Sequence, residues 1–389
     1  MKTMYLPKIS HITSGFVAVL VGYTSSVAII FQAALASGAS SDQISSWLWA
    51  LGIGMGVTSF GLSLYYKTPI LTAWSTPGAA LLATGLSGTS LEEAIGLFIV
   101  CSILITFCGL TGIFEKIMSY VPSTLASAML AGVLFPFALN GFGALSTHPL
   151  LVGSMVVVFF ILKKVLPNYA VPFVLIIGIA IASLQSLIAY EDVSLLISTP
   201  IWITPSFSLG SILGIGLPLF IVTMASQNVP GLAVLRSHDY QVSASPLISC
   251  TGIAGIVLAP FGGFAFNLAA ITAAICMGED ADKNKASRYF ASMWAGGFYI
   301  LMGLFSTTVV ALFSAFPQAL VLAIAALALL GTIGNSLHQA LNQPSERDSA
   351  LLTFLITASG MSMFGIGSAF WGLIIGLCVY HFNLVKSRV

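Results

Sequence analysis

The chain has 389 residues, of which 58% are apolar and only 6% are charged. Soluble domains carry roughly 25% charged residues, so the composition excludes an ordinary soluble protein and predicts one integral membrane domain. The net charge of +1 argues against nucleic acid as a partner.

The amino-terminal stretch MKTMYLPKIS lacks a small-residue cleavage site, so we expect the apolar run after it to be retained as a first membrane span. A helix needs about 20 apolar residues to cross the hydrocarbon core. With charged residues and Pro/Gly clusters as boundaries, the sequence predicts an all-α membrane protein of 14 segments. The first seven are residues 12–37, 43–66, 69–86, 92–113, 122–142, 149–165 and 169–190.

A polar and aromatic connector, residues 191–207, precedes the second set of segments. These are residues 208–235, 243–259, 260–278, 287–313, 317–341, 347–364 and 367–384. Residues 1–190 and 208–389 thus form two halves of seven segments each. Because seven is odd, the second half runs opposite to the first, which is the inverted-repeat design. Short matches at equal places support the repeat: VGYTSSV with VTMASQN, and TPGAALLA with FNLAAITA.

Charged residues predict the orientation of these segments. With the amino terminus inside, all 13 Lys and Arg residues fall at the inner ends, whereas acidic residues such as Glu92 and Asp192 fall at the outer ends. This distribution follows the positive-inside rule without exception. We therefore expect both termini to be cytoplasmic.

Two short segments, 68–86 and 259–278, are interrupted at their middles by Pro, Gly or Asn. Such a pair at matching places in two halves indicates a transporter's binding site. We expect each segment to be extended first and helical afterwards. Thr76 would cap a helix whose first residue is Pro77, and Asn267 would cap its counterpart.

Both helices would then begin near the middle of the bilayer, with free N–H groups that attract anions. The sequence therefore predicts an anionic or acceptor-rich substrate between Ser75–Gly78 and Phe264–Asn267. The alternative is that Pro and Gly merely kink two packed helices.

The residues around the interrupted segments are aromatic or neutral and polar, and aromatic faces suit a planar ring. The candidate substrate-binding residues are Tyr23, Ser25, Ser26, Trp74, Ser75, Thr76, Pro77, Gly78, Gln227, Asn228, Phe264, Phe266 and Asn267. As alternatives, single Phe residues would pack or face lipid, and the Gln227–Asn228 pair would make an interhelical hydrogen bond.

Several kinds of site are not visible in the sequence. All 12 Asp and Glu residues and all five His residues fall at predicted segment ends or in loops, so no proton relay is expected at mid-membrane. The five Cys residues lie in apolar segments at spacings that match no metal motif. There is no nucleotide-binding motif and no catalytic constellation, so we expect neither an enzyme nor a bound cofactor.

Four long motifs resemble the benzoate/proton symporter family, the BenE-type inner membrane proteins of bacteria. They are LTAWSTPGAALL (71–82), PLFIVTMASQNVPG (218–231), PFGGFAFNLAAITAAICMG (260–278) and GSAFWGLIIG (367–376). The resemblance covers essentially the whole chain. It implies import of benzoate or a similar aromatic carboxylate, driven by the proton gradient across the inner membrane.

That family in turn resembles the seven-plus-seven inverted-repeat fold of nucleobase/proton symporters and sulfate/bicarbonate transporters. This implies a core domain from the first four segments and the eighth to eleventh, and a gate domain from the fifth to seventh and the twelfth to fourteenth. Substrate would bind between the two interrupted segments. Transport would be a rigid-body movement of core against gate, in a lipid bilayer, and a homodimer through the gate domain is expected.

One difference from the nucleobase symporters limits the class of substrate that we expect. Those proteins often carry carboxylates where this chain has Gln227, Asn228, Phe266 and Asn267. A buried carboxylate would repel benzoate, whereas amides would not, so the departure favours a carboxylate substrate. A nucleobase or inorganic-anion carrier, or a proton-independent anion facilitator, is the alternative, and the proton-coupling residue is not identified.

Overall fold

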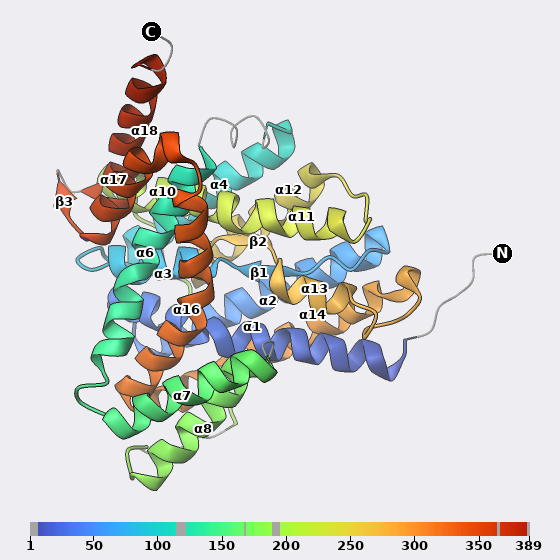
Figure 1. Ribbon diagram of the computed structural model, residues 1–389. Helices are drawn as coiled ribbons and strands as arrows, with labels where there is room; N and C mark the ends of the chain where they lie inside the picture. The colour runs from blue at the N-terminus through green and yellow to red at the C-terminus, as the bar shows by residue number, and fades with distance from the viewer. Residues whose placement is uncertain (1–6, 114–121, 167–168, 189–194, 364–365, 387–389) are drawn as a thin grey trace.

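The structure is a computed structural model that describes residues 7–113, 122–166, 169–188, 195–363 and 366–386. These residues are predominantly helical (Figure 1). The first half contains α1 (Ile9–Ala36), α2 (Ser41–Tyr66), β1 (Thr72–Trp74), α3 (Thr76–Gly85), α4 (Leu91–Thr111), α6 (Ser123–Gly143), α7 (Pro149–Val165) and α8 (Ala170–Leu184).

The second half begins with a continuous run, Leu209–Arg236, which meets the length and hydropathy of a span. This run comprises α9 (Leu209–Ser211), the π-helical turn η2 (Ile212–Gly216), α10 (Leu217–Thr223), the π-helical turn η3 (Met224–Asn228) and α11 (Val229–Ser237). The remaining elements are α12 (Ala244–Leu258), η4 (Ala259–Phe261), β2 (Phe266–Leu268), α13 (Ile271–Met277), η5 (Lys285–Ser287), α14 (Tyr289–Leu304), α15 (Ser306–Ala315), α16 (Gln318–Leu341), η6 (Pro344–Glu346), α17 (Arg347–Ala358), β3 (Ser362–Met363), β4 (Ile366–Gly367) and α18 (Ser368–Lys386).

Within the described residues, seven helices are long and apolar enough to cross a membrane. An eighth is obtained if Lys285–Leu304 and Ser306–Ala315 count as one span, although they are bent by 67°. The single segment expected over 287–313 is therefore two helices, with Phe305 at the bend.

Helices from the two halves pack against one another throughout the molecule. The most extensive contacts join α2 with α14, α4 with α12 and α6 with α16. Between α2 and α14 the backbones approach so closely that a Cβ on Gly52 would lie 2.6 Å from Gly303 Cα. Small residues allow such approach between membrane helices.

The two interrupted segments are joined at the centre of the molecule by antiparallel pairing of β1 with β2 (Figure 1). Thr72 pairs with Leu268, and Trp74 pairs with Phe266. Backbone that leaves the helix inside a membrane protein must find partners within the protein, and this ladder supplies them. Thr72 is fixed further, because its Oγ1 donates to Met55 O at 3.0 Å and its N–H donates to Ser59 Oγ at 2.9 Å.

The caps of the two following helices differ from expectation. α3 begins at Thr76 and is capped by Ser75, whose Oγ accepts from Gly78 N–H at 3.0 Å, so the prediction of a Thr76 cap is wrong by one residue. The prediction that Asn267 caps the second helix is also wrong. The β1–β2 pairing extends to the bond from Ala269 N–H to Leu71 O, which holds the chain extended past Asn267. α13 therefore starts at Ile271, after Ala270.

Candidate functional site

A cavity of about 1410 Å³ lies beside the paired strands and reaches one end of the helices. Its deep part is lined by residues of α1, β1, α3, η3 and α14, and α6 and α16 form the opposite wall. At the other end it is lined by Gly278, Asp280, Asn342 and Gln343, and we call this end the mouth. Among the described lining residues Asp280 is the only charged one, so the deep part is neutral.

Six of the thirteen candidate residues line this cavity. They are Ser25, Ser26, Trp74, Thr76, Pro77 and Gln227. The other seven lie outside its lining, and they are Tyr23, Ser75, Gly78, Asn228, Phe264, Phe266 and Asn267.

The Trp74 indole is held in place by α1. Its Nε1–H donates to Ser26 Oγ at 2.8 Å, and that hydroxyl donates in turn to Gly22 O at 2.8 Å. The Tyr23 ring meets the indole edge-on, with ring centroids 4.8 Å apart. Because its hydrogen bond and this ring contact fix its orientation, Trp74 presents a preorganised aromatic surface to the cavity.

The two half-helices offer different amounts of free backbone N–H. In α3 the N–H groups of Gly78 and Ala79 are both used, by Ser75 Oγ and Ser75 O. Pro77 has none, so Thr76 provides the N–H that remains available. In α13 the cap residue Ala270 contributes no side-chain bond, and Ala270, Ile271 and Thr272 line the cavity.

Gln227 and Asn228 lie in the π-helical turn η3, and π-helical turns are rare and frequent at functional sites. The Gln227 side chain lines the cavity, and no hydrogen bond joins it to another described residue. Asn228 is fully buried, and its Oδ1 accepts from Leu268 N–H at 2.9 Å. The second amide of the pair thus supports β2.

Phe264 and Phe266 lie behind the paired strands. The Phe264 ring packs 5.1 Å from the Phe98 ring and 5.9 Å from the Trp47 ring. A Cβ on Gly54 would lie 2.4 Å from the Phe266 ring, so this glycine makes room for that ring. Both side chains are fully buried in the core, away from the cavity lining.

Other lining residues were not anticipated from the sequence. Tyr169 and Tyr299 contribute aromatic surface, and Thr272 lines the cavity from α13. On α16 the polar lining residues follow one helical face, and they are Thr332, Asn335, Ser336 and Gln339. Their spacing of three and four residues is a periodic polar signal that could have predicted this wall. Ser127 on α6 donates to Gln339 Oε1 at 3.0 Å across it.

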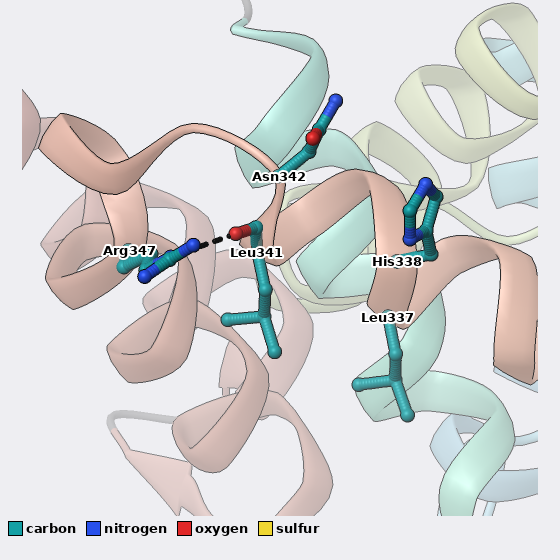
Figure 2. Close-up of a pocket in the computed structure, with 5 residues that line it drawn as sticks. All are labelled: Leu337, His338, Leu341, Asn342 and Arg347. Atoms are coloured by element: carbon teal, nitrogen blue, oxygen red, sulfur yellow. Dashed lines mark hydrogen bonds between the residues drawn. The ribbon is translucent and has the colours of Figure 1, made fainter.

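A smaller pocket of about 370 Å³ lies at the end of α16 and shares Asn342 with the mouth. Figure 2 shows His338 and Arg347 at its opposite sides, with Leu341 and Asn342 between them and Leu337 below His338. Arg347 Nε donates to Leu341 O at 2.9 Å, which closes the end of the helix.

Comparisons with known proteins match nearly the full chain. Residues 6–382 match the family described as "Benzoate membrane transport protein". The chain is 50% identical over 376 residues to "Inner membrane protein YdcO" of Escherichia coli K12, covering 96% of each. It is 41% identical over 380 residues to the "Benzoate membrane transport protein" of Acinetobacter baylyi, covering 98% of this chain and 96% of the relative.

Solved structures with this fold are distant in sequence. The anion transporter SLC26A9 aligns with TM-score 0.63 at 13% identity, over 97% of this chain and 66% of that one. The transmembrane domain of the cyanobacterial bicarbonate transporter BicA aligns with TM-score 0.63 at 12% identity, over 96% and 97%. At such identity the likeness shows the fold alone.

Proposed function

The chain belongs to the benzoate membrane transport protein family, as its motifs suggested, and from this premise we propose that it imports benzoate or a related aromatic carboxylate with protons across the bacterial inner membrane. The observation that carries the proposal is the neutral deep end of the cavity, where the fixed Trp74 indole and the unpaired Gln227 amide both lie in the lining. A planar ring with one acceptor-rich end matches these two groups.

In the proposed complex the substrate ring contacts Trp74, and its carboxylate accepts hydrogen bonds from the Gln227 amide and the Thr76 N–H. Hydrogen bonds to an ionised acceptor are stronger than those between neutral groups. The described lining residues include no acidic group at this depth to repel a carboxylate. A nucleobase or inorganic-anion carrier of the same fold is the alternative, and the indole wall favours the aromatic acid over an inorganic anion.

The proposed mechanism is alternating access by two inverted repeats of seven segments, including the half-extended segments that contain β1–α3 and β2–α13. Contacts between helices support the repeat. If the second and fourth segments are α2 and α4, their repeat partners are α12 and α14. The contacts of α2 with α14 and of α4 with α12 are then exchanged by the repeat.

The same proposal assigns the domains. The core consists of segments one to four and eight to eleven, and the gate consists of segments five to seven and twelve to fourteen. The core moves as a rigid body against the gate. Both termini are cytoplasmic, and two copies associate through the gate.

Uptake of radiolabelled benzoate into proteoliposomes tests the proposal. Neutral benzoic acid crosses lipid unaided, so protein-free liposomes are the control, and both buffers stay above about pH 6, where a carboxyl with a pKa near 4 is ionised. Protein-dependent accumulation is expected to rise with an inwardly directed proton gradient and to collapse with a protonophore. Protein-dependent uptake that ignores the gradient would contradict symport and favour a facilitator. If the protein adds nothing to benzoate uptake, the substrate assignment is wrong.

A further inference from the structure

A buried charged cluster lies at the beginning of α1, apart from the substrate-lining residues. His11 is fully buried, and Asp282, in the link after α13, is 6% exposed. His11 Nε2 lies 3.1 Å from Asp282 Oδ2, and Lys8 Nζ lies 2.9 Å from the same oxygen. Among the described residues, His11, Asp282 and Arg288 are the ionisable Asp, Glu, His, Lys or Arg side chains buried to this degree.

Hydrogen bonding fixes the protonation state of His11. The backbone N–H of Lys8 donates to His11 Nδ1 at 2.9 Å. An N–H group can only donate, so Nδ1 carries a lone pair and the single imidazole proton is on Nε2, where it is donated to Asp282. His11 is therefore neutral in this conformation, and its side chain accepts the Lys8 N–H at the first turn of α1, while its own backbone N–H donates to Lys8 O at 3.1 Å.

The carboxylate partner stays ionised. Burial opposes its charge, but hydrogen bonds from Lys8, Ser287 and the Asn284 backbone, with the charge of Lys8, outweigh burial and hold the pKa of Asp282 below its usual range. A depressed pKa contributes stability that is present above the ordinary carboxyl value of about 4 and is lost as the pH falls through the folded value. Asp282 is thus an anion throughout the range in which a histidine titrates.

The other groups around the pair are also defined. Arg288 donates to the backbone oxygens of Asp282 and Met277. Its guanidinium is therefore bound to the Asp282 backbone and not to the Asp282 carboxylate. The Phe290 ring of α14 lies 5.5 Å from the imidazole. Tyr240 from the end of α11 donates to Lys285 O and borders Arg288. The charged groups facing His11 are therefore Lys8 and Asp282.

The pair lies directly behind the mouth of the cavity. Thr13 and Ser14, which follow His11 on α1, line the cavity, as do Gly278 and Asp280, which precede Asp282. The hydrogen bond between His11 and Asp282, with the ion pair of Lys8 and Asp282, thus ties the beginning of α1 to the chain after α13. Figure 1 shows these two segments on the same side of the molecule.

We propose that His11 and Asp282 form a proton-binding site at the mouth, which takes one proton from water on His11 Nδ1 and releases the Lys8 N–H from its hydrogen bond. The imidazolium then has donors on both nitrogens and keeps Asp282 as its partner. No other bond changes. The structure described is the proton-free form, and binding of the proton breaks the bond from the Lys8 N–H to His11, loosens the first turn of α1 and slows transport as the pH at the mouth falls.

Nitrogen-15 NMR of the histidines in lipid nanodiscs tests the site directly. The His11 signal is assigned by its loss in His11→Gln. The expected result is the neutral Nε2–H tautomer at pH 8, which converts to imidazolium as the pH is lowered to 5.5, together with faster amide exchange of Lys8. An imidazolium already present at pH 8, an Nδ1–H tautomer, or a signal unchanged down to pH 5.5 would overturn the proposal.

The effect on transport is measured as exchange of benzoate across proteoliposome membranes with equal pH on both sides. This second test rests on the proposed function. Gln has a side-chain oxygen that accepts the N-cap N–H when Gln stands at the N3 position of a helix, so His11→Gln keeps this hydrogen bond without a titrating group. Exchange by the parent is expected to fall several-fold between pH 8 and pH 5.5, and exchange by His11→Gln to stay nearly level. The exposed His338 (Figure 2) provides the matched control, because His338→Gln should keep the parent's profile.

The outcomes separate the two proposals. If His11→Gln shows the same fall as the parent, the proton site is wrong and the transport assignment stands. If the parent protein exchanges no aromatic acid, the transport assignment is wrong, and the imidazole titration still decides the proton site.

Discussion

Gln227 and Asn228 are adjacent residues with the same functional group and different surroundings. The π-helical turn that contains them places Gln227 in the cavity lining and buries Asn228 against the backbone of β2. An amide can donate to a carboxylate and has no charge of its own. In the proposed complex, this distinction at position 227 sets which substrates the deep end of the cavity would accept.

Gln227→Glu is expected to weaken benzoate binding more than Gln227→Ala does. The alanine variant loses a donor, whereas the glutamate adds a like charge in a poorly solvated site. The expected loss for the glutamate variant is about tenfold, or ~1.4 kcal/mol, measured by calorimetry at pH 8 so that the new carboxyl is ionised. Gln43→Glu is the matched control, because Gln43 lies outside the cavity lining and its capping box with Ser40 also accepts Glu. Equal affinity in Gln227→Glu and the parent would refute the electrostatic argument.

At the scale of elements, the sequence located both interrupted segments because Pro, Gly and Asn mark breaks in helices. The sequence could not show whether Ser75 or Thr76 caps α3, because both have a hydroxyl and the cap is the residue whose backbone is still extended. The end of β2 could not be predicted either, because it is set by pairing with β1, which is far away in the sequence. For the same reason the sequence could not tell that Phe264 and Phe266 face the core.

The loop between η4 and β2 depends on one glycine. Gly262 has φ +92°, and a Cβ there would lie 1.8 Å from Trp47 Cδ1. We expect Gly262→Ala to lower the melting temperature in detergent strongly, because the left-handed backbone and the fixed indole both resist the methyl group.

Gly297→Ala is the control for that substitution. Gly297 lies inside α14, and a methyl group added there would meet no atom of the described residues within 4 Å. Alanine should therefore leave the melting temperature unchanged or raise it, because it favours the helix over glycine by about 1 kcal/mol. If the Gly262→Ala protein had the same melting temperature as its parent, the loop between η4 and β2 would have rearranged to accept the methyl group.

At the scale of the whole molecule, the cavity lies between two facing surfaces of the protein. One is formed by α1 and the paired interrupted segments, and the other by the hydroxyl and amide faces of α6 and α16. In a transporter that works by alternating access, the second surface must be wetted in at least one state. Its polar stripe is consistent with that requirement.

Thiol labelling tests on which side of the membrane the mouth lies. In a background without the five native cysteines, Asn335→Cys is expected to react with a membrane-impermeant maleimide in inverted vesicles and not in right-side-out vesicles, because Asn335 lines the cavity. Benzoate should slow the reaction. Val257→Cys is the control, since Val257 is 62% exposed on α12 outside the cavity and should face lipid, where a thiol stays protonated and unreactive. Labelling of Asn335→Cys from the opposite side would reverse the proposed orientation.

The pairing of β1 with β2 has a thermodynamic consequence for the proposed carrier. Because the two half-helices are joined backbone to backbone, they travel as one body, and a substrate between them meets the same groups on either side of the membrane. The dissociation constants at the two faces should then be nearly equal, and such a carrier has no built-in direction. Net flux would follow the combined gradients of acid and proton, so a cell would lose aromatic acid through the same protein once its outward acid gradient exceeded the inward proton gradient.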